Sequence, residues 1–480
     1  MKILLSAVNS GYIHTALAVR ALSAYVCSDS VSFMEFTINE RVSDVVRSIY
    51  EYGADTVIFS CYIWNIEFVI KTASIIKKIA PDTVIVFGGP EVSYDSVMYM
   101  EKYPFVDAII RGEGEETLKE IIEKGLDVSG VTYRNENGSI VKNESRMPVC
   151  DLDTLPFPYS EQEIEENKDK LFYYESSRGC PFSCSYCLSS TVRNVRFKSI
   201  DIVKRELALF AKHGARVVKL TDRTFNADRK RAAELIEFLA SLECRTQFHF
   251  EIAADLINER ILEAFRNAPE DRFLLEIGVQ STNDRTIAAI DRKTDFKRIA
   301  EAVKALKESV HMHLDLIAGL PYEDYDSFVK SFNDTMALKP DVLQLGFLKL
   351  LRGTKMRDES DLHGYIYSDT PPYEVLGNDY ISYDELIHLK DIEYIVERYY
   401  NDSVFRNSLE YMSRFYTSPY DMYDNIAEYF KKKGYFALGI SQSKLYSILA
   451  EFVPDERFKD YLKLDYFINT HNPSTPVWAL

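Results

Sequence analysis

Short apolar runs alternate with helix-like stretches over the first quarter of the chain. Between the runs, apolar residues recur every three or four positions, as at Ile66, Ile70, Ala73 and Ile76. Five such strand-and-helix units predict a doubly wound parallel sheet, in which ligands bind beyond the carboxyl ends of the strands. The predicted strands are residues 2–8, 31–36, 56–60, 83–87 and 107–110.

The alternation resumes between residues 171 and 349, where strand-like runs are separated by segments rich in Ala, Leu, Glu and Lys. Six consecutive units of this kind predict an open or partial barrel of parallel strands, with chemistry at its carboxyl rim. The predicted strands lie near residues 171–176, 216–221, 247–252, 273–279, 311–317 and 341–349.

Two regions lack this alternation. One holds a hairpin turn at residues 135–138, several prolines and an acidic run, which predict an interdomain connection. The other, after Gly353, holds 17 of the 32 tyrosines within residues 351–480 and has a helical pattern. The predicted α/β organisation is a Rossmann-like domain (1–124), a connection (125–170), a partial (β/α)6 barrel (171–352) and a mostly helical carboxyl-terminal domain (353–480).

Composition and charge narrow the function. The 480 residues are 46% hydrophobic, which excludes disorder over most of the chain. The 57 Lys and Arg residues against 74 Asp and Glu residues give a net charge of -17, which disfavours general binding to nucleic acid. No apolar run approaches the ~18 residues that cross a bilayer, and the apolar start of the chain ends at Asn9, too early for an export signal. The sequence therefore predicts a cytoplasmic protein without a membrane segment.

Three of the seven cysteines lie close together, at Cys180, Cys184 and Cys187. Such a group in a long chain favours a metal site over disulfides. Thiolates with CxxxCxxC spacing can hold three corners of an iron-sulfur cube and leave the fourth iron open to a substrate or cofactor. A zinc site completed by a distant histidine or by Cys244 is the alternative that these residues leave open.

This cysteine spacing, on the loop after the first strand of a partial barrel, resembles the radical S-adenosylmethionine (SAM) superfamily. The resemblance covers residues 171–352. Residues 278–281 with Arg292 resemble a fourth-strand segment of the branch that contains coproporphyrinogen dehydrogenase-like enzymes. Residues 315–321 resemble the fifth-strand signature of that branch, and residues 352–354 resemble its sixth-strand exit. The resemblance favours a 4Fe-4S iron-sulfur cluster on the three cysteines over zinc, and it implies that SAM chelates the open iron.

The same resemblance implies which residues contact SAM. Thr221 and Asp222 stand where the superfamily has a Gly-Gly-Glu stretch, so their oxygens are candidates to hold the methionine amine. Glu251 and Asp255 are expected at the ribose or the substrate, and Arg292 at the methionine carboxylate. An ordinary surface or helix-capping salt bridge is the alternative for each. The expected SAM contacts are Tyr186, Thr221, Asp222, Glu251, Gln280, Ser281, Arg292 and Gly319.

Residues 86–91 and 109–115 of the first domain resemble the cobalamin-binding half of cobalamin-dependent radical enzymes. Their glycines are expected to let the backbone approach the corrin, where a Cβ would clash. The better-known pattern of Asp-x-His-x-x-Gly is absent around His14, so we expect a lower cobalt face without a protein ligand. The expected cobalamin contacts are Asn9, Tyr12, His14, Ser60, Gly88, Gly89, Pro90, Glu91, Gly112, Glu113 and Gly114.

Two other interpretations of the first domain are weaker. A methylthiotransferase would carry a second cluster on three cysteines, but Cys27, Cys61 and Cys150 are too scattered to converge, so we interpret them and Cys244 as packing or surface residues. Residues 111–114 resemble part of a dinucleotide fingerprint but follow the fifth strand and lack its third glycine.

The whole chain resembles cobalamin-binding radical SAM enzymes with an uncharacterised carboxyl-terminal extension. The resemblance implies an enzyme that transfers methyl to an unactivated carbon of a small-molecule or peptide substrate, using methylcobalamin and a 5'-deoxyadenosyl radical. The alternatives are cyclisation, ring contraction or rearrangement without methyl transfer, a methylthiotransferase-like enzyme, and a non-catalytic cobalamin or redox sensor. A flavodoxin or ferredoxin is the implied electron donor. The sequence specifies neither the substrate nor the oligomeric state.

Overall fold

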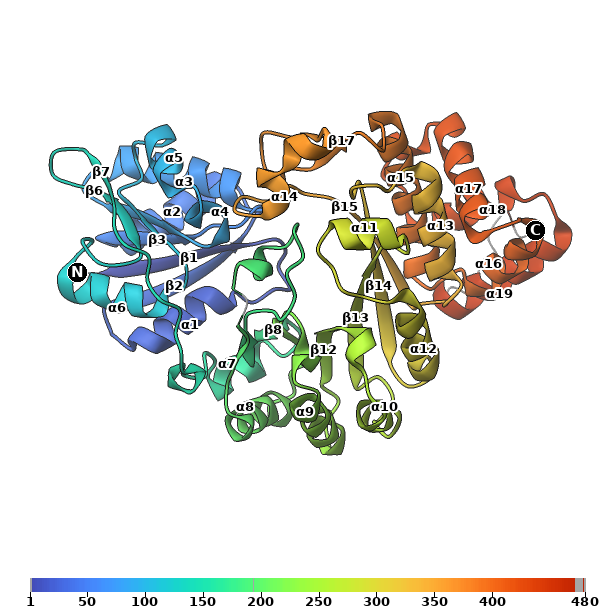
Figure 1. Ribbon diagram of the computed structural model, residues 1–480, viewed down its shortest axis with the longest axis horizontal. Coiled ribbons are helices and arrows are strands. Elements are labelled where there is room, and N and C mark those ends of the chain that lie inside the picture. The colour runs from blue at the N-terminus through green and yellow to red at the C-terminus, as the bar shows by residue number, and fades with distance from the viewer. Residues whose placement is uncertain (1, 193, 471–477, 479–480) are drawn as a thin grey trace.

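The computed structural model, which describes residues 2–192, 194–470 and 478, has three parts along its long axis (Figure 1). The first domain lies at one end, the central parallel sheet lies in the middle, and the helical carboxyl-terminal region lies at the other end. The predicted α/β class, with its Rossmann-like, barrel and helical parts, is confirmed.

A seven-stranded sheet with the order β2-β1-β3-β4-β5-β6-β7 forms the first domain. Its first five strands are parallel and apolar on both sides, so α1 and α6 cover one face while α2, α3 and α5 cover the other. The strands are β1 (Ile3–Asn9), β2 (Val31–Thr37), β3 (Thr56–Ser60), β4 (Val84–Gly88), β5 (Ala108–Ile110), β6 (Val131–Arg134) and β7 (Ile140–Lys142). The helices are α1 (Leu17–Val26), α2 (Val42–Tyr52), α3 (Ile66–Ile79), α4 (Pro90–Ser93), α5 (Ser96–Lys102) and α6 (Glu115–Lys124).

The hairpin expected in the interdomain connection extends this sheet instead. Strand β6 pairs antiparallel with β5, where Ile110 lies opposite Val131, and β7 pairs with β6. This pairing covers the edge of β5, which would otherwise expose its backbone hydrogen-bonding groups. The connection that follows holds the short helix α7 (Glu161–Glu166).

The central sheet has six parallel strands in the order β15-β14-β13-β12-β11-β8. Along these strands buried apolar residues alternate with less buried ones, so one face packs against helices and the other faces the interior of the partial barrel. The strands are β8 (Leu171–Tyr174), β11 (Val217–Leu220), β12 (Gln247–Ile252), β13 (Phe273–Gln280), β14 (His311–Ala318) and β15 (Val342–Phe347). The helices are α8 (Ile200–Lys212), α9 (Arg229–Ser241), α10 (Glu259–Arg266), α11 (Asp284–Ala289), α12 (Phe296–Leu306) and α13 (Tyr325–Met336).

The carboxyl-terminal region packs against the β15 side of the central sheet. The side chain of Asn401 bonds both the N–H and the carbonyl of Leu343, which satisfies the edge strand, and the hydroxyls of Tyr325 on α13 and Tyr420 on α17 lie 2.7 Å apart. The elements are α14 (Lys355–Asp358), β16 (Ile366–Tyr367), β17 (Val375–Gly377), α15 (Tyr383–Val396), α16 (Arg406–Met412), α17 (Pro419–Lys433), α18 (Gln442–Phe452) and α19 (Glu456–Thr470).

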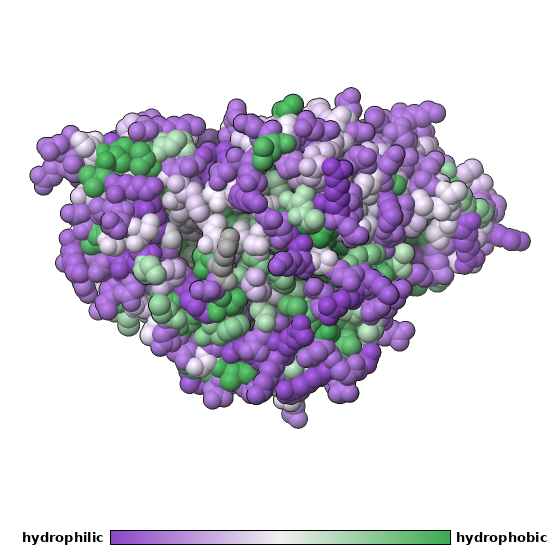
Figure 2. All heavy atoms as spheres, in the orientation of Figure 1, coloured by the Kyte–Doolittle hydropathy of each residue, from purple (hydrophilic) through white to green (hydrophobic). Residues whose placement is uncertain are grey.

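Polar residues predominate on the face shown in Figure 2, and apolar residues form smaller groups between them. Among the described residues, no helix has both the length and the apolar character that crossing a membrane requires.

Candidate functional site

The loop that carries the three cysteines meets the first domain through ion pairs. Arg178, directly before the cysteine segment, lies 2.5 Å from Glu115 and 3.2 Å from Glu113. Arg196, on the returning strand of the loop, lies 2.5 Å from Glu113. Glu113 and Glu115 follow β5, so the carboxyl end of the first sheet is held against the carboxyl rim of the barrel.

A short hairpin of β9 (Ser177–Arg178) and β10 (Arg196–Phe197) frames the cysteine segment. Gly179 has φ +96°, and a Cβ there would lie 2.4 Å from the carbonyl oxygen of Asn194, so only glycine fits this entry to the loop. All three cysteines are free thiols, with Cys180 and Cys184 buried and Cys187 partly buried.

Arg292 joins the cysteine segment to the exit of β13. Its Nη1 lies 3.7 Å from the sulfur of Cys184 and 3.4 Å from the hydroxyl of Tyr186, and its Nη2 donates to the carbonyl of Gly278 at 2.6 Å. Burial raises the pKa of the Cys184 thiol, and the nearby Arg292 charge opposes that increase. Arg292 therefore favours the thiolate form of Cys184, which is the form that ligates iron.

Among the described residues, no group of three or more His, Cys, Asp or Glu side chains is arranged to hold a metal ion. A single tetrahedral zinc requires sulfurs at about 2.3 Å from one centre. A cube spreads three thiolates over three iron atoms and needs a wider spacing. The finding therefore concerns sites for single metal ions.

Two of the expected SAM contacts already have protein partners. Asp222 accepts hydrogen bonds from the N–H groups of Ser176 and Ser177 at 2.8 and 3.0 Å, and from the Ser176 hydroxyl at 2.5 Å. Asp222 thus organises the chain as it leaves β8. Ser281 donates its hydroxyl to Glu323 at 2.5 Å, so it positions the segment after β14.

Replacing Glu323 by glutamine is expected to flatten the pH dependence of stability. Burial raises the pKa of Glu323 from 4.5 to about 7, against opposing hydrogen bonds from Ser281 and Ser331. The folded chain therefore binds a proton more tightly than the unfolded chain. This contribution to the free energy of unfolding, about 3 kcal/mol, is complete below pH ~4.5 and is lost as the pH rises to about 7.

Urea unfolding at about pH 5 and about pH 8 measures the effect. The wild type should lose more stability between the two values than the Glu323→Gln variant does. Equal losses in the two proteins would contradict this assignment.

Several side chains around the rim carry buried polar atoms without a hydrogen-bond partner, and three of them matter here. They are Gln280 through Oε1, Asp315 through Oδ1 and Arg292 through Nε. Gln280 has φ +68° at the end of β13, and Asp315 lies on β14 in register with Gly278. Asp315 lies within the fifth-strand signature, but it was not among the SAM contacts expected from the sequence. Its carboxylate between two buried leucines is the signal that identifies it.

The remaining expected SAM contacts lie at the ends of barrel strands or on the loops that follow them. Glu251 lies near the end of β12, 3.8 Å from Arg223, and Thr221 lies at the exit of β11. The carbonyl of Gly319 accepts hydrogen bonds from Tyr365 at 3.0 Å and from Asn378 at 2.9 Å. The carboxyl-terminal region therefore holds the loop after β14 in place.

Glu91 is buried and has protein partners, although it was expected at the corrin. It accepts a hydrogen bond from Tyr99 at 2.5 Å and another from Tyr373, and it lies 3.5 Å from Arg352. Arg352 also pairs with Asp95 at 2.6 Å. A carboxylate of the first domain therefore anchors the barrel exit and the carboxyl-terminal region at one point.

The glycine after β4 is required by the protein's own packing. Gly89 has φ +107°, and a Cβ there would lie 2.5 Å from the carbonyl oxygen of Cys61. Gly114 packs against Leu22, whereas Gly112 has open space around it and leaves room for a ligand. Gly89 therefore lets the loops after β3 and β4 touch, whereas corrin approach at Gly112 stays a prediction.

The loop after β1 reaches the barrel. Asn9 donates from its amide to the carbonyl of His14 at 3.1 Å, and Nδ1 of His14 lies 2.9 Å from the hydroxyl of Tyr173 on β8. Burial, and then the charge of Lys219, lower the pKa of His14, which favours a neutral imidazole. Tyr12 is 79% exposed. The positions of the other expected cobalamin contacts are the end of β3 for Ser60, the end of β4 for Gly88 and the first turn of α4 for Pro90.

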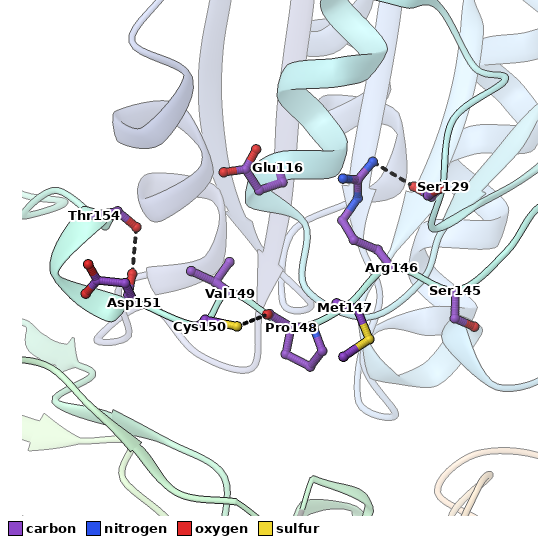
Figure 3. A pocket seen from close by; sticks show the side chains of 10 residues that line it. All are labelled: Glu116, Ser129, Ser145, Arg146, Met147, Pro148, Val149, Cys150, Asp151 and Thr154. Carbon is purple, nitrogen blue, oxygen red and sulfur yellow. Dashed lines mark hydrogen bonds between the residues drawn. The ribbon is translucent and has the colours of Figure 1, made fainter.

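The other cysteines lie apart from the cluster loop and from one another. Cys27 ends α1, Cys61 is buried after β3, and Cys150 is exposed in the connection. Cys150 lines a cavity of about 510 Å³ between α6 and the connection (Figure 3). In this cavity Arg146 is already bonded to Thr117, Glu120 and the carbonyl of Ser129, so its charge is not available for a ligand.

Three family models match successive parts of the chain. Residues 3–122 match the B12 binding domain, residues 174–335 match the Radical SAM superfamily, and residues 361–480 match a protein of unknown function, DUF4080.

The chain is similar to known cobalamin-dependent enzymes. It is 28% identical over 335 residues to the cobalamin-dependent radical SAM methyltransferase TokK from Streptomyces tokunonensis, a match that covers 64% of this chain and 48% of TokK. This chain thus spans about half the length of that relative. The structure of the methyltransferase TsrM from Kitasatospora setae, with cobalamin and an iron-sulfur cluster bound, has a TM-score of 0.63 at 16% identity, over 77% of this chain and 78% of that one.

The structure of the radical enzyme OxsB with aqua-cobalamin and SAM bound also has a TM-score of 0.63 at 16% identity. Its match covers 97% of this chain and 79% of OxsB. At these identities the two structural likenesses show a shared fold.

Proposed function

Because the chain belongs to the radical SAM enzymes that carry a B12 binding domain, we propose that it is a cobalamin-dependent methyltransferase acting on an unactivated carbon of a small-molecule or peptide substrate. The observation that carries this proposal is the direct connection between the two cofactor loops. Arg178 and Arg196 of the cysteine loop bind Glu113 and Glu115 after β5, so the two candidate cofactor sites share one wall.

The residues at the rim fit an iron-sulfur cluster and SAM. Three free thiols lie on one loop, and Arg292 favours the thiolate of Cys184. The unpartnered oxygens of Gln280 and Asp315 are buried acceptors without a donor, an arrangement that is costly unless a ligand supplies one. The hydroxyls of a nucleoside are suitable donors for both. We therefore assign the nucleoside of SAM to Gln280 and Asp315, and the cluster to Cys180, Cys184 and Cys187.

The first domain fits a flat, extended ligand beyond the carboxyl ends of its strands. A Cβ added at Gly112 would meet no other atom within 4 Å, and Ser60 lies beside Gly88 in the register of β3 and β4. When bound, the cluster supplies the electron that cleaves SAM and cobalamin supplies the transferable methyl group. Asn9 and His14 hold the loop after β1 against the barrel, so they position the site.

Product analysis tests this function without a known substrate. Protein reconstituted anaerobically with iron, sulfide and cobalamin is reduced in the presence of SAM, and the nucleoside products are separated. We expect both S-adenosylhomocysteine, from methylation of cobalamin, and 5'-deoxyadenosine, from reductive cleavage. Formation of 5'-deoxyadenosine alone would favour a cyclisation or rearrangement. Bound cofactors with neither product would favour a sensor.

A further inference from the structure

A layer of polar side chains crosses the inner face of the central sheet. These residues alternate along their strands with apolar residues that pack against the helices, so they face the barrel interior. Barrels of this kind usually fill that space with branched apolar side chains. The polar layer consists of Tyr173, Lys219, His249, Glu276, His313 and Gln344, one residue from each strand.

Neighbouring members of the polar layer lie side by side. Tyr173 is in register with Lys219, Lys219 with His249, and Glu276 with His313. The Lys219 ammonium donates to Glu276 Oε2 at 2.6 Å, and His249 Nε2 lies 3.1 Å from the same oxygen. One carboxylate oxygen therefore serves two basic groups.

Among the described residues, no hydrogen bond uses Nε2 of His313. Gln344 Nε2 lies 3.3 Å from His313 Nδ1, so the amide donates to that nitrogen and the proton of the neutral ring is on Nε2. The centres of the His313 and His249 rings are 6.0 Å apart. Gln344 is exposed, so the polar layer is open to solvent at the β15 edge.

Bases outnumber acids at this depth of the barrel. His14 reaches the layer through Tyr173, and His311 lies 5.1 Å from His313, centre to centre. Four of the eight histidines of the chain thus gather around Lys219 and Glu276. The other acids facing this space are Glu251 and Asp315, each two residues nearer the rim, and Asp341, which lies 3.9 Å from His311.

Burial keeps the imidazoles of the layer in the neutral form. Burial, and then the His311 and His249 charges, lower the pKa of His313 to about 4, and burial also lowers the pKa of His249. Burial opposes ionisation of Glu276, yet His249 and Lys219 lower its pKa to about 2. The imidazoles are therefore neutral near pH 7 and would gain protons beside an added negative charge.

We propose that the polar layer binds an anionic group of the substrate, a carboxylate or a phosphate, through Lys219, His249 and His313. The inference rests on the proposed function, since it assigns a substrate class to the barrel of that enzyme. The N–H groups of Lys219 and the two imidazoles favour an anion here. Nearer the rim, burial raises the pKa of Glu251 and of Asp315, so their carboxyl groups suit the hydroxyl and amine groups of SAM. The anionic end of the substrate therefore lies deep in the barrel, with its reacting carbon toward the cysteine loop.

Titration calorimetry with inorganic phosphate and with acetate tests this site on the reconstituted protein, against sodium chloride at equal ionic strength. We expect saturable binding of at least one anion with proton uptake, detected as a difference between buffers of unequal ionisation heat. Lys219→Met and His313→Gln should each weaken that binding by about tenfold or more. Preference for phosphate or acetate then identifies the anion class.

His388→Gln is the matched control, because His388 pairs with Asp424 in the carboxyl-terminal region, and it should leave anion binding unchanged. Absence of saturable binding, equal binding in wild type and both variants, or binding of methylammonium in place of the anions would overturn the proposal. Cluster absorbance, cobalamin content and SAM cleavage without substrate should persist in the His388→Gln control. Their loss in wild type would count against the proposed function instead.

Discussion

The Cys184→Ala variant is expected to lose both the visible absorbance of the iron-sulfur cluster and the cleavage of SAM, with activity reduced at least ~100-fold. The loop has only three cysteines, so removing one thiolate leaves a second iron of the cluster without a protein ligand. The sulfur of Cys184 also lies 3.7 Å from Nη1 of Arg292, which links the cluster loop to β13, the strand that ends at the nucleoside candidate Gln280. Anaerobic absorbance spectra, iron content and the yield of 5'-deoxyadenosine measure the effect.

Cys244→Ala is the matched control for this substitution. Cys244 is a free, partly buried thiol on the approach to β12, away from the cysteine loop, so its variant should bind the cluster as the wild type does. A fully active Cys184→Ala protein would refute the assignment of the cluster ligands. An equal loss in both variants would indicate damage to the fold.

The second large effect is expected from Gly89→Ala, which should prevent retention of cobalamin. The added Cβ would lie 2.5 Å from the carbonyl oxygen of Cys61 at a backbone φ of +107°. A backbone carbonyl cannot rotate away as a side chain can, so the loops after β3 and β4 must separate. We expect a loss of about 2 to 5 kcal/mol in the free energy of unfolding, from strain and clash together. Cobalamin that remains after gel filtration, together with the thermal midpoint, measures the effect.

Gly53→Ala is the control that separates the effect of backbone strain from the effect of the steric clash. Gly53 has φ +68° at the end of α2, and nothing lies within 4 Å of its added Cβ. This control should lose only about 1 kcal/mol and should bind cobalamin normally. Wild-type cobalamin retention by Gly89→Ala would show that the loop after β4 does not form part of the corrin site.

The strands of both sheets were predictable because their signal is local. A strand that is buried on both sides is an apolar run, as at residues 56–60, which match β3 residue for residue. A strand with one buried face alternates instead, as at residues 247–252, which match β12. The hairpin turn at residues 135–138 was equally local. The sheet that this hairpin joins could not be predicted, because the sequence of a two-stranded hairpin does not specify which sheet edge it pairs with.

The partners of the polar candidates were not predictable in the same way. Asp222 stands at the expected strand exit, but its carboxylate holds the loop after β8, 46 residues earlier in the chain. Glu91 belongs to the cobalamin-like motif, yet it bonds Tyr373, 282 residues away. A motif identifies a residue type at a turn, whereas the direction of its hydrogen bonds depends on neighbours supplied by other domains.

By itself the sequence determined the order of the three parts, the strands and the cysteine loop, since periodicity and spacing are properties of a continuous segment. Only the tertiary structure decided which charged side chains remain available to ligands. Buried polar atoms need hydrogen-bond partners, and those partners come from distant segments that the fold brings together. For this reason Glu113 and Glu91 bind the rest of the protein, while Oδ1 of Asp315 has no hydrogen-bond partner among the described residues.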